Sequence, residues 1–100
     1  MENTKYWQFF NYADRHHLNC VRLNANSTYD HEFEKFKTAW EILQDGRSFL
    51  TEARLLNLKG RVDIVDLTEG VILEIVNTES DESIEAKRKV YPLPIQVIKI

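Results

Sequence analysis

A chain of 100 residues with a net charge of −3 is long enough for one domain with a modest hydrophobic core. Its 43% hydrophobic content predicts folding rather than disorder, and no apolar run is long enough to cross a bilayer. The slightly acidic balance argues against a surface that coats nucleic acid broadly, and a single cysteine, Cys20, excludes an intrachain disulfide. We therefore expect a cytoplasmic protein with no membrane partner.

The N-terminal segment, residues 1–26, is expected to be an extension in front of a core domain at residues 27–100. A helix near residues 3–17 is predicted because apolar side chains recur there at helical spacing. They are Tyr6, Phe9, Phe10 and Ala13. Aromatic residues in this pattern favour a core or dimer contact, so we expect a homodimer interface on this segment, with base stacking as the alternative. Residues 20–26 are predicted to be a short strand or a linker.

The next helix is predicted from about Thr28 to Asp45. Ser27 and Asp30 match a capping box at its start, and Gly46 is expected to end it in the left-handed conformation. Its apolar stripe, expected to face the core, consists of Phe33, Phe36, Trp40 and Leu43.

Three polar residues near the start of this helix have alternative interpretations. Glu32 is expected to support the helix N-terminus through the helix dipole rather than bind a metal. His31 and Lys35, four residues apart, are expected on a solvated face, with phosphate contact as the alternative.

Three strands are predicted next. Residues 47–55 alternate in a way that places Leu50, Glu52 and Arg54 on one face. Residues 61–67 and 71–76 are rich in β-branched side chains, and the tight turn between them places Gly70 where a positive φ is needed.

The register of this hairpin brings two acids together. If Asp66 pairs with Val71, the same register pairs Asp63 with Glu74. Carboxylates in apolar strands are costly to bury without a partner, and two together repel, which raises a pKa or requires a cation. The alternative is an edge hairpin with solvated acids.

The last elements are a helix at about residues 79–89, opened by a Thr78–Asp81 capping box, and a strand at 95–100. Lys87 lies on the inner stripe of that helix, and Pro92 and Pro94 end it. The final strand is expected to run parallel to a neighbour. The order helix, strand, strand, strand, helix, strand predicts an α/β fold with an αβββαβ core, in which helices flank a short mixed sheet.

This order, with the acids on it, resembles the PD-(D/E)XK nuclease superfamily, which has a restriction-endonuclease-like core. The matching residues are Glu52 in FLTEARL, Asp63 in GRVDIVDL and Glu74 in ILEIV. The resemblance covers residues 27–100. It implies that these three carboxylates bind Mg²⁺ or Mn²⁺, and that the chain is a nuclease acting on DNA phosphodiester bonds.

One position departs from the family pattern. Val76 stands where the motif has its lysine, two residues after the glutamate. Lys87 on the following helix is the expected substitute, which makes the catalytic set Asp63, Glu74 and Lys87. Two other classes stay open: a catalytically inactive module of the same fold that binds nucleic acid or protein, and a structural protein without a ligand. Val76 favours the inactive module, whereas the paired acids favour the enzyme.

Overall fold

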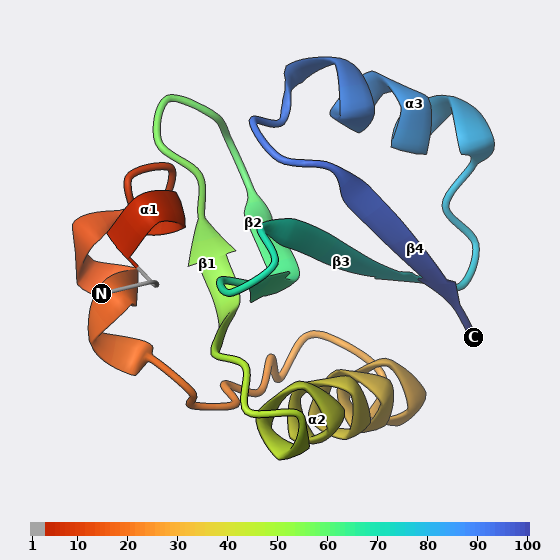
Figure 1. Ribbon diagram of the computed structural model, residues 1–100. Helices are drawn as coiled ribbons and strands as arrows, with labels where there is room; N and C mark the ends of the chain where they lie inside the picture. Colours follow the sequence, from red (N-terminus) through yellow and green to blue (C-terminus); the bar gives the residue numbers. More distant parts are fainter. Residues whose placement is uncertain (1–3) are drawn as a thin grey trace.

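A four-stranded mixed sheet lies at the centre of this computed structural model, which describes residues 4–100 (Figure 1). In chain order the elements are α1 (Thr4–Trp7), a 3₁₀ helix (Tyr12–His17), α2 (Tyr29–Gln44), β1 (Phe49–Arg54), β2 (Arg61–Asp66), β3 (Val71–Val76), α3 (Asp81–Val90) and β4 (Ile95–Lys99). No helix in this part of the chain has the length and apolar character needed to span a membrane.

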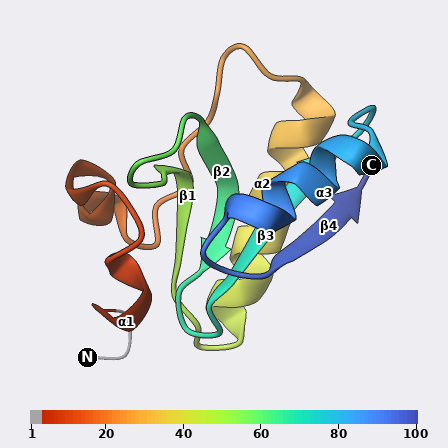
Figure 2. The same cartoon turned by 90° about the horizontal axis from the view of Figure 1, so that it is seen from above.

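The strands lie in the order β1-β2-β3-β4. β2 is antiparallel to both β1 and β3, and β4 runs parallel to β3 after the crossover through α3. α2 and α3 cover opposite faces of the sheet, as both views show (Figures 1 and 2). The α/β class, the mixed sheet and the parallel last strand are therefore as the sequence predicts.

The sheet separates two apolar cores. The first lies under α2, where Ala39 and Ile42 pack against Ile64 and Ile75. The second lies on the other face, where the N-terminal segment and the chain after α3 cover the sheet. Ile64 and Ile75 are buried, as expected from their strand positions.

The predicted inner stripe of α2 is wrong. Phe33, Phe36 and Trp40 are about half exposed, and the buried residues of this helix are Lys35, Thr38, Ala39 and Ile42. That second set also follows i, i+3, i+4, i+7 spacing. The small side chain of Ala39 permits a close approach of α2 to the sheet. The charged residue of this set, Lys35, is paired with the carboxylates of Glu32 and Glu52.

The N-terminal segment is two short helices rather than one. Between them Phe10 forms a bridge to Leu55, and the backbone N–H of Asn11 donates to the Arg54 carbonyl at 2.8 Å. The segment therefore follows the outer edge of β1. Phe10 is fully buried, and its aromatic neighbours pack partly against the same core. Residue 3, where the predicted helix begins, lies outside the described residues, and the homodimer contact expected on this segment stays a prediction.

Both helix caps lie later than predicted. The Thr28 side chain accepts from the His31 N–H at 3.2 Å, so α2 begins at Tyr29. The Ser80 hydroxyl accepts from the Ser83 N–H at 3.1 Å, so α3 begins at Asp81. In each case the residue that caps is the one whose extended backbone aims its oxygen at the first turn. Gly46 ends α2 with a φ of +75°, as predicted.

Candidate functional site

The hairpin of β2 and β3 is paired only near its turn. Backbone pairing follows the predicted register from Asp66–Val71 to Ile64–Leu73 and ends there. Beyond that point the Asp63 N–H donates to Glu74 Oε2 at 3.0 Å, and the Ile75 N–H donates to Asp63 Oδ2 at 2.8 Å. Side-chain carboxylates thus replace backbone carbonyls between the two strands. We call this place, formed by Asp63, Glu74 and Ile75, the strand fork.

The two acids at the fork have raised pKa values. Burial raises the pKa of Asp63, against the lowering effect of the hydrogen bond from Ile75. Burial also raises the pKa of Glu74, and the nearby charge of Asp63 raises it further. Water and the surrounding cations therefore do not fully compensate the two negative charges. A further cation near two such buried carboxylates lowers their electrostatic free energy and stabilises them.

Lys87 reaches the fork from α3. Its Nζ lies 3.1 Å from Glu74 Oε1 and 2.9 Å from Glu79 Oε2. Burial lowers the pKa of this amine, but the hydrogen bond to Glu79 and the charge of Glu74 outweigh that effect and raise it above its usual value. Lys87 is therefore a fixed positive charge at neutral pH. Val76, two residues after Glu74, is buried and apolar.

The start of α2 supplies charged residues from the other side of the sheet. His31 Nε2 lies 3.4 Å from Asp63 Oδ1, and His31 Nδ1 lies 2.7 Å from Glu32 Oε2. Burial raises the pKa of Glu32, but hydrogen bonds from Lys35, the Asn24 N–H and His31 outweigh it and lower the pKa to about 2. Glu32 is thus part of the charge network rather than only a helix-dipole residue.

Lys35 is the buried cation of this network. Its side chain is fully buried, and its Nζ lies 2.6 Å from Glu32 Oε1 and 3.0 Å from Glu52 Oε2. It also donates to the Arg22 carbonyl at 3.1 Å. The expectation of a solvated face for His31 and Lys35 is therefore wrong, since both turn toward the sheet. A buried ammonium is tolerated here because two carboxylates and a carbonyl surround it.

Glu52 sits at an irregularity in β1. Thr51 pairs with Ile64 and Ala53 with Val62, which places Glu52 opposite Asp63 in the sheet. Its φ is +53°, a left-handed conformation that breaks the alternation of β1, so the predicted division of that strand into two faces is wrong. The turned backbone directs the carboxylate to Lys35.

The three predicted metal ligands therefore form one row across β1, β2 and β3, but they do not form one cluster. Asp63 and Glu74 meet at the fork, whereas the Glu52 carboxylate faces Lys35 and lies 3.9 Å from Arg61 Nη1. Within residues 4–100, no group of three or more His, Cys, Asp or Glu side chains is close enough to hold a metal ion. The structure brings Lys87 to Glu74 and leaves Glu52 with other partners.

No family model, curated protein or solved structure matches this chain. The resemblance to the PD-(D/E)XK superfamily therefore rests on the order of the elements and on the three acids Glu52, Asp63 and Glu74 alone.

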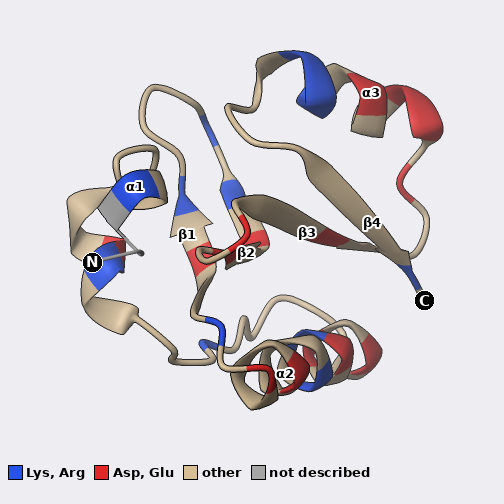
Figure 3. Cartoon of the chain, in the orientation of Figure 1, with Lys and Arg blue, Asp and Glu red and all other residues tan. Residues whose placement is uncertain are grey.

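Basic side chains gather at the β1–β2 loop, next to the start of β2, and one of them, Arg54, is paired with Asp14. Arg54, Lys59 and Arg61 are exposed at the end of β1, in the following loop and at the start of β2. Figure 3 shows these positions in blue, together with the second half of α3, which contains Lys87. The acids of α3 lie in its first half.

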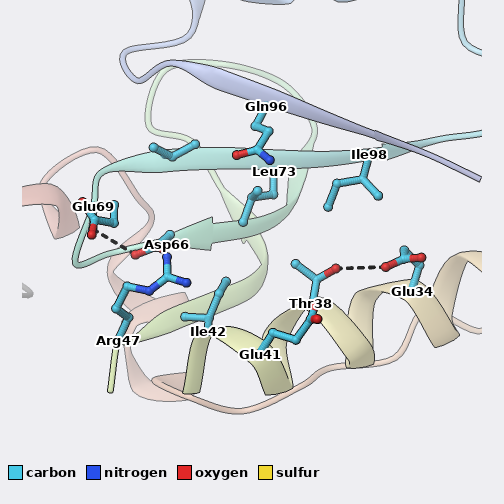
Figure 4. Close-up of a pocket in the computed structure, with 11 residues that line it drawn as sticks. Glu34, Thr38, Glu41, Ile42, Arg47, Asp66, Glu69, Leu73, Gln96 and Ile98 are labelled. Atoms are coloured by element: carbon cyan, nitrogen blue, oxygen red, sulfur yellow. Dashed lines mark hydrogen bonds and ion pairs between the residues drawn. The ribbon is translucent and has the colours of Figure 1, made fainter. Parts of the chain in front are cut away.

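A separate cleft lies between α2 and the β3–β4 edge (Figure 4). It has a volume of about 480 Å³ and is lined by Glu34, Glu41 and Glu69, with Arg47 as its cation. The carboxylates of this acidic cleft repel phosphate, and none of the fork residues lines it. It is not the candidate site.

Proposed function

We propose that this chain is a nuclease-like domain that hydrolyses DNA phosphodiester bonds with Mg²⁺ or Mn²⁺. The observation that supports it is the strand fork, where two carboxylates with raised pKa values lie beside a permanently charged lysine. Hydrolysis of a phosphodiester needs an anchored cation and positive charge near the phosphate. The αβββαβ order of α2 to β4 agrees with this proposal.

Two of the three predicted ligands, Asp63 and Glu74, lie where they could bind a hard cation such as Mg²⁺. Asp63 and Glu74 offer only oxygen atoms, the ligands that Mg²⁺ prefers, and Mg²⁺ is often held by one or two carboxylates with water and phosphate completing its shell. When bound, the metal would neutralise the phosphate and activate water for attack. Glu52 as a third ligand stays a prediction, because its carboxylate faces Lys35 in the structure.

In this proposal the chain's own residues have separate tasks. Asp63 and Glu74 hold the cation, and the backbone N–H groups at the fork fix their orientation. Lys87 contacts phosphate as a positive charge, because the raised pKa of its amine makes it a poor base. Arg61 and its basic neighbours in the β1–β2 loop hold the DNA backbone at the same end of the sheet.

A nicking assay on supercoiled plasmid, with Mg²⁺ and then Mn²⁺, tests the proposal. We expect metal-dependent cleavage by the wild type, and its loss in Glu74→Gln and in Lys87→Ala. Lys89→Ala is the matched control, because Lys89 is exposed on the same helix. Lys87→Ala at the wild-type rate, with Glu74→Gln inactive, would remove Lys87 from the site.

A second candidate is an inactive module of the same fold that binds nucleic acid. It is favoured by the hydrogen bonds at the fork, because Asp63 and Glu74 already accept from the facing strands and can serve as a structural tie. This candidate predicts no cleavage under any metal condition. It also predicts DNA binding that is unchanged by EDTA and weakened by Arg61→Ala, measured by fluorescence anisotropy.

A further inference from the structure

The outer side of α2 has an apolar stripe that nothing in the described chain covers. It consists of Tyr29, Phe33, Phe36, Trp40 and Leu43. These residues are 79%, 54%, 51%, 52% and 40% exposed. Neighbouring rings stack along the helix, with centroids 6.0 Å apart for Tyr29–Phe33 and 6.5 Å apart for Phe36–Trp40. A patch of this size on one helix marks an interaction surface.

The spacing of the stripe indicates the kind of partner. Its members are separated by four, three, four and three residues, which is the a/d pattern of a coiled-coil seam. Packing on the sheet requires only the buried stripe of α2, so an apolar stripe on the outer side of the same helix does not contribute to the fold of one chain. The pattern therefore points to another helix.

We propose that this helix is α2 of a second copy of the chain, packed antiparallel across a two-fold axis. In that arrangement Tyr29 faces the partner's Trp40, and Phe33 faces the partner's Phe36. The symmetry repeats both contacts, so four aromatic layers fill the seam.

The charges beside the stripe fit the same arrangement. Asp30 and Lys37 are exposed and seven residues apart on one flank of the seam. In the antiparallel register, Asp30 lies beside the partner's Lys37, and the two-fold axis generates the pair twice. The surface is thus complementary to itself in charge as well as in apolar pattern.

The area is sufficient for a weak dimer. At the observed exposures, the four aromatic residues offer roughly 500 Å² per protomer, so a dimer buries about 1,000 Å² before the flanking residues are counted. This is near the lower limit for a specific interface, and we expect dissociation constants in the micromolar range.

The proposal does not depend on the proposed nuclease function. Lys35 and His31 point from α2 to the sheet, whereas the stripe points away from it. The dimer contact also differs from the one expected on the N-terminal segment, whose aromatic residues pack partly against their own core.

Sedimentation equilibrium over about 1–500 μM tests the dimer. We expect a reversible monomer–dimer equilibrium for the wild type and a monomer throughout for Phe33→Ser/Phe36→Ser. Far-UV circular dichroism checks that this variant still folds, as expected for exposed positions. Val90→Ser is the control, because Val90 is a similarly exposed apolar residue on α3. A monomeric wild type overturns the proposal and assigns the stripe to a different partner.

A charge exchange tests the antiparallel register. Lys37→Asp and Asp30→Lys each replace two attractive pairs by two repulsive ones, and we expect each to weaken the dimer by roughly tenfold. The double variant restores opposite charges and should recover the wild-type dissociation constant. Two single variants that weaken the dimer without recovery in the double variant would overturn the antiparallel pairing.

Discussion

Two aspartates on β2, three residues apart, have different surroundings. Asp66, at the turn, is buried, and its Oδ1 accepts from the Thr68 and Glu69 N–H groups while its Oδ2 accepts from Arg47. Asp63, at the fork, accepts from one backbone N–H and lies beside another carboxylate. The negative charge of Asp66 is thus compensated by its hydrogen bonds and its arginine, whereas the negative charge of Asp63 is compensated only in part.

This difference separates a structural acid from a candidate ligand. A carboxylate that accepts several hydrogen bonds and pairs with an arginine already has its negative charge compensated within the protein. One whose pKa is raised by burial and by a neighbouring acid is stabilised by any cation that reaches it. Four experiments test how these buried charges are compensated.

The largest effect is expected for Asp66→Ala. It removes the acceptor of two turn N–H groups and leaves the Arg47 guanidinium without its buried partner. The two N–H groups left without an acceptor should lower the free energy of unfolding by about 3–5 kcal/mol, measured by urea denaturation, whereas Arg47 keeps its second carboxylate, Asp45. Asp66→Asn keeps an acceptor for the turn and should cost less. A loss below about 1 kcal/mol in Asp66→Ala would show that the turn does not depend on this carboxylate.

Glu32→Gln is expected to have the next largest effect. Because the pKa of Glu32 is lowered to about 2 on folding, its ionised form stabilises the protein above the ordinary pKa of 4.5. The variant should therefore lose about 2–3 kcal/mol at neutral pH, and the difference should shrink as pH falls from about 5 toward 2. Urea denaturation at several pH values measures it. A constant difference across this range would mean that the Glu32 charge is not the cause.

The sequence predicts much of this contrast. Two strands rich in β-branched residues and Gly70 in the turn between them define the hairpin, so its register follows from a local pattern. That register places Asp63 beside Glu74 and puts Asp66, paired with Val71, next to the turn. Lys87 is expected there because the resemblance calls for a substitute for the lysine that Val76 replaces, and Lys87 lies on the inner stripe of the helix that follows β3.

Two features could not be predicted, because tertiary contacts decide them. α2 has two stripes with helical spacing, and the more hydrophobic one is outside. The buried stripe includes Lys35, whose burial depends on Glu52 from a strand seventeen residues away. Glu52 in turn reaches it only through a left-handed φ, which propensity disfavours for glutamate. A signal was present in the 35, 38, 39, 42 spacing, but hydrophobicity alone points to the aromatic stripe.

Metal binding should give an effect that is smaller still. A divalent cation that binds only the folded protein stabilises it by about 1–2 kcal/mol when its concentration is roughly ten times the dissociation constant. We expect Mg²⁺ or Mn²⁺ to raise the thermal midpoint of the wild type, and Asp63→Asn to abolish most of the gain. Asp66→Asn, the same chemical change on the same strand, should retain it. An equal gain in Asp63→Asn and the wild type would place the cation elsewhere.

The smallest effect is expected for the stability of Asp63→Asn without metal. Folding raises the pKa of Asp63, so its protonated form stabilises the protein below the ordinary pKa of 3.8, and this contribution is lost as pH rises through the folded value. An amide keeps an oxygen for the Ile75 N–H and cannot ionise, so it avoids that loss. In EDTA the variant should match the wild type at acid pH and exceed it by about 1 kcal/mol or less at neutral pH. Asp66→Asn should instead be less stable than the wild type at neutral pH, because Arg47 loses the buried one of its two carboxylate partners and keeps only Asp45. If both variants lose stability at neutral pH, the fork carboxylate is as structural as the one at the turn, and the case for a cation at Asp63 and Glu74 fails.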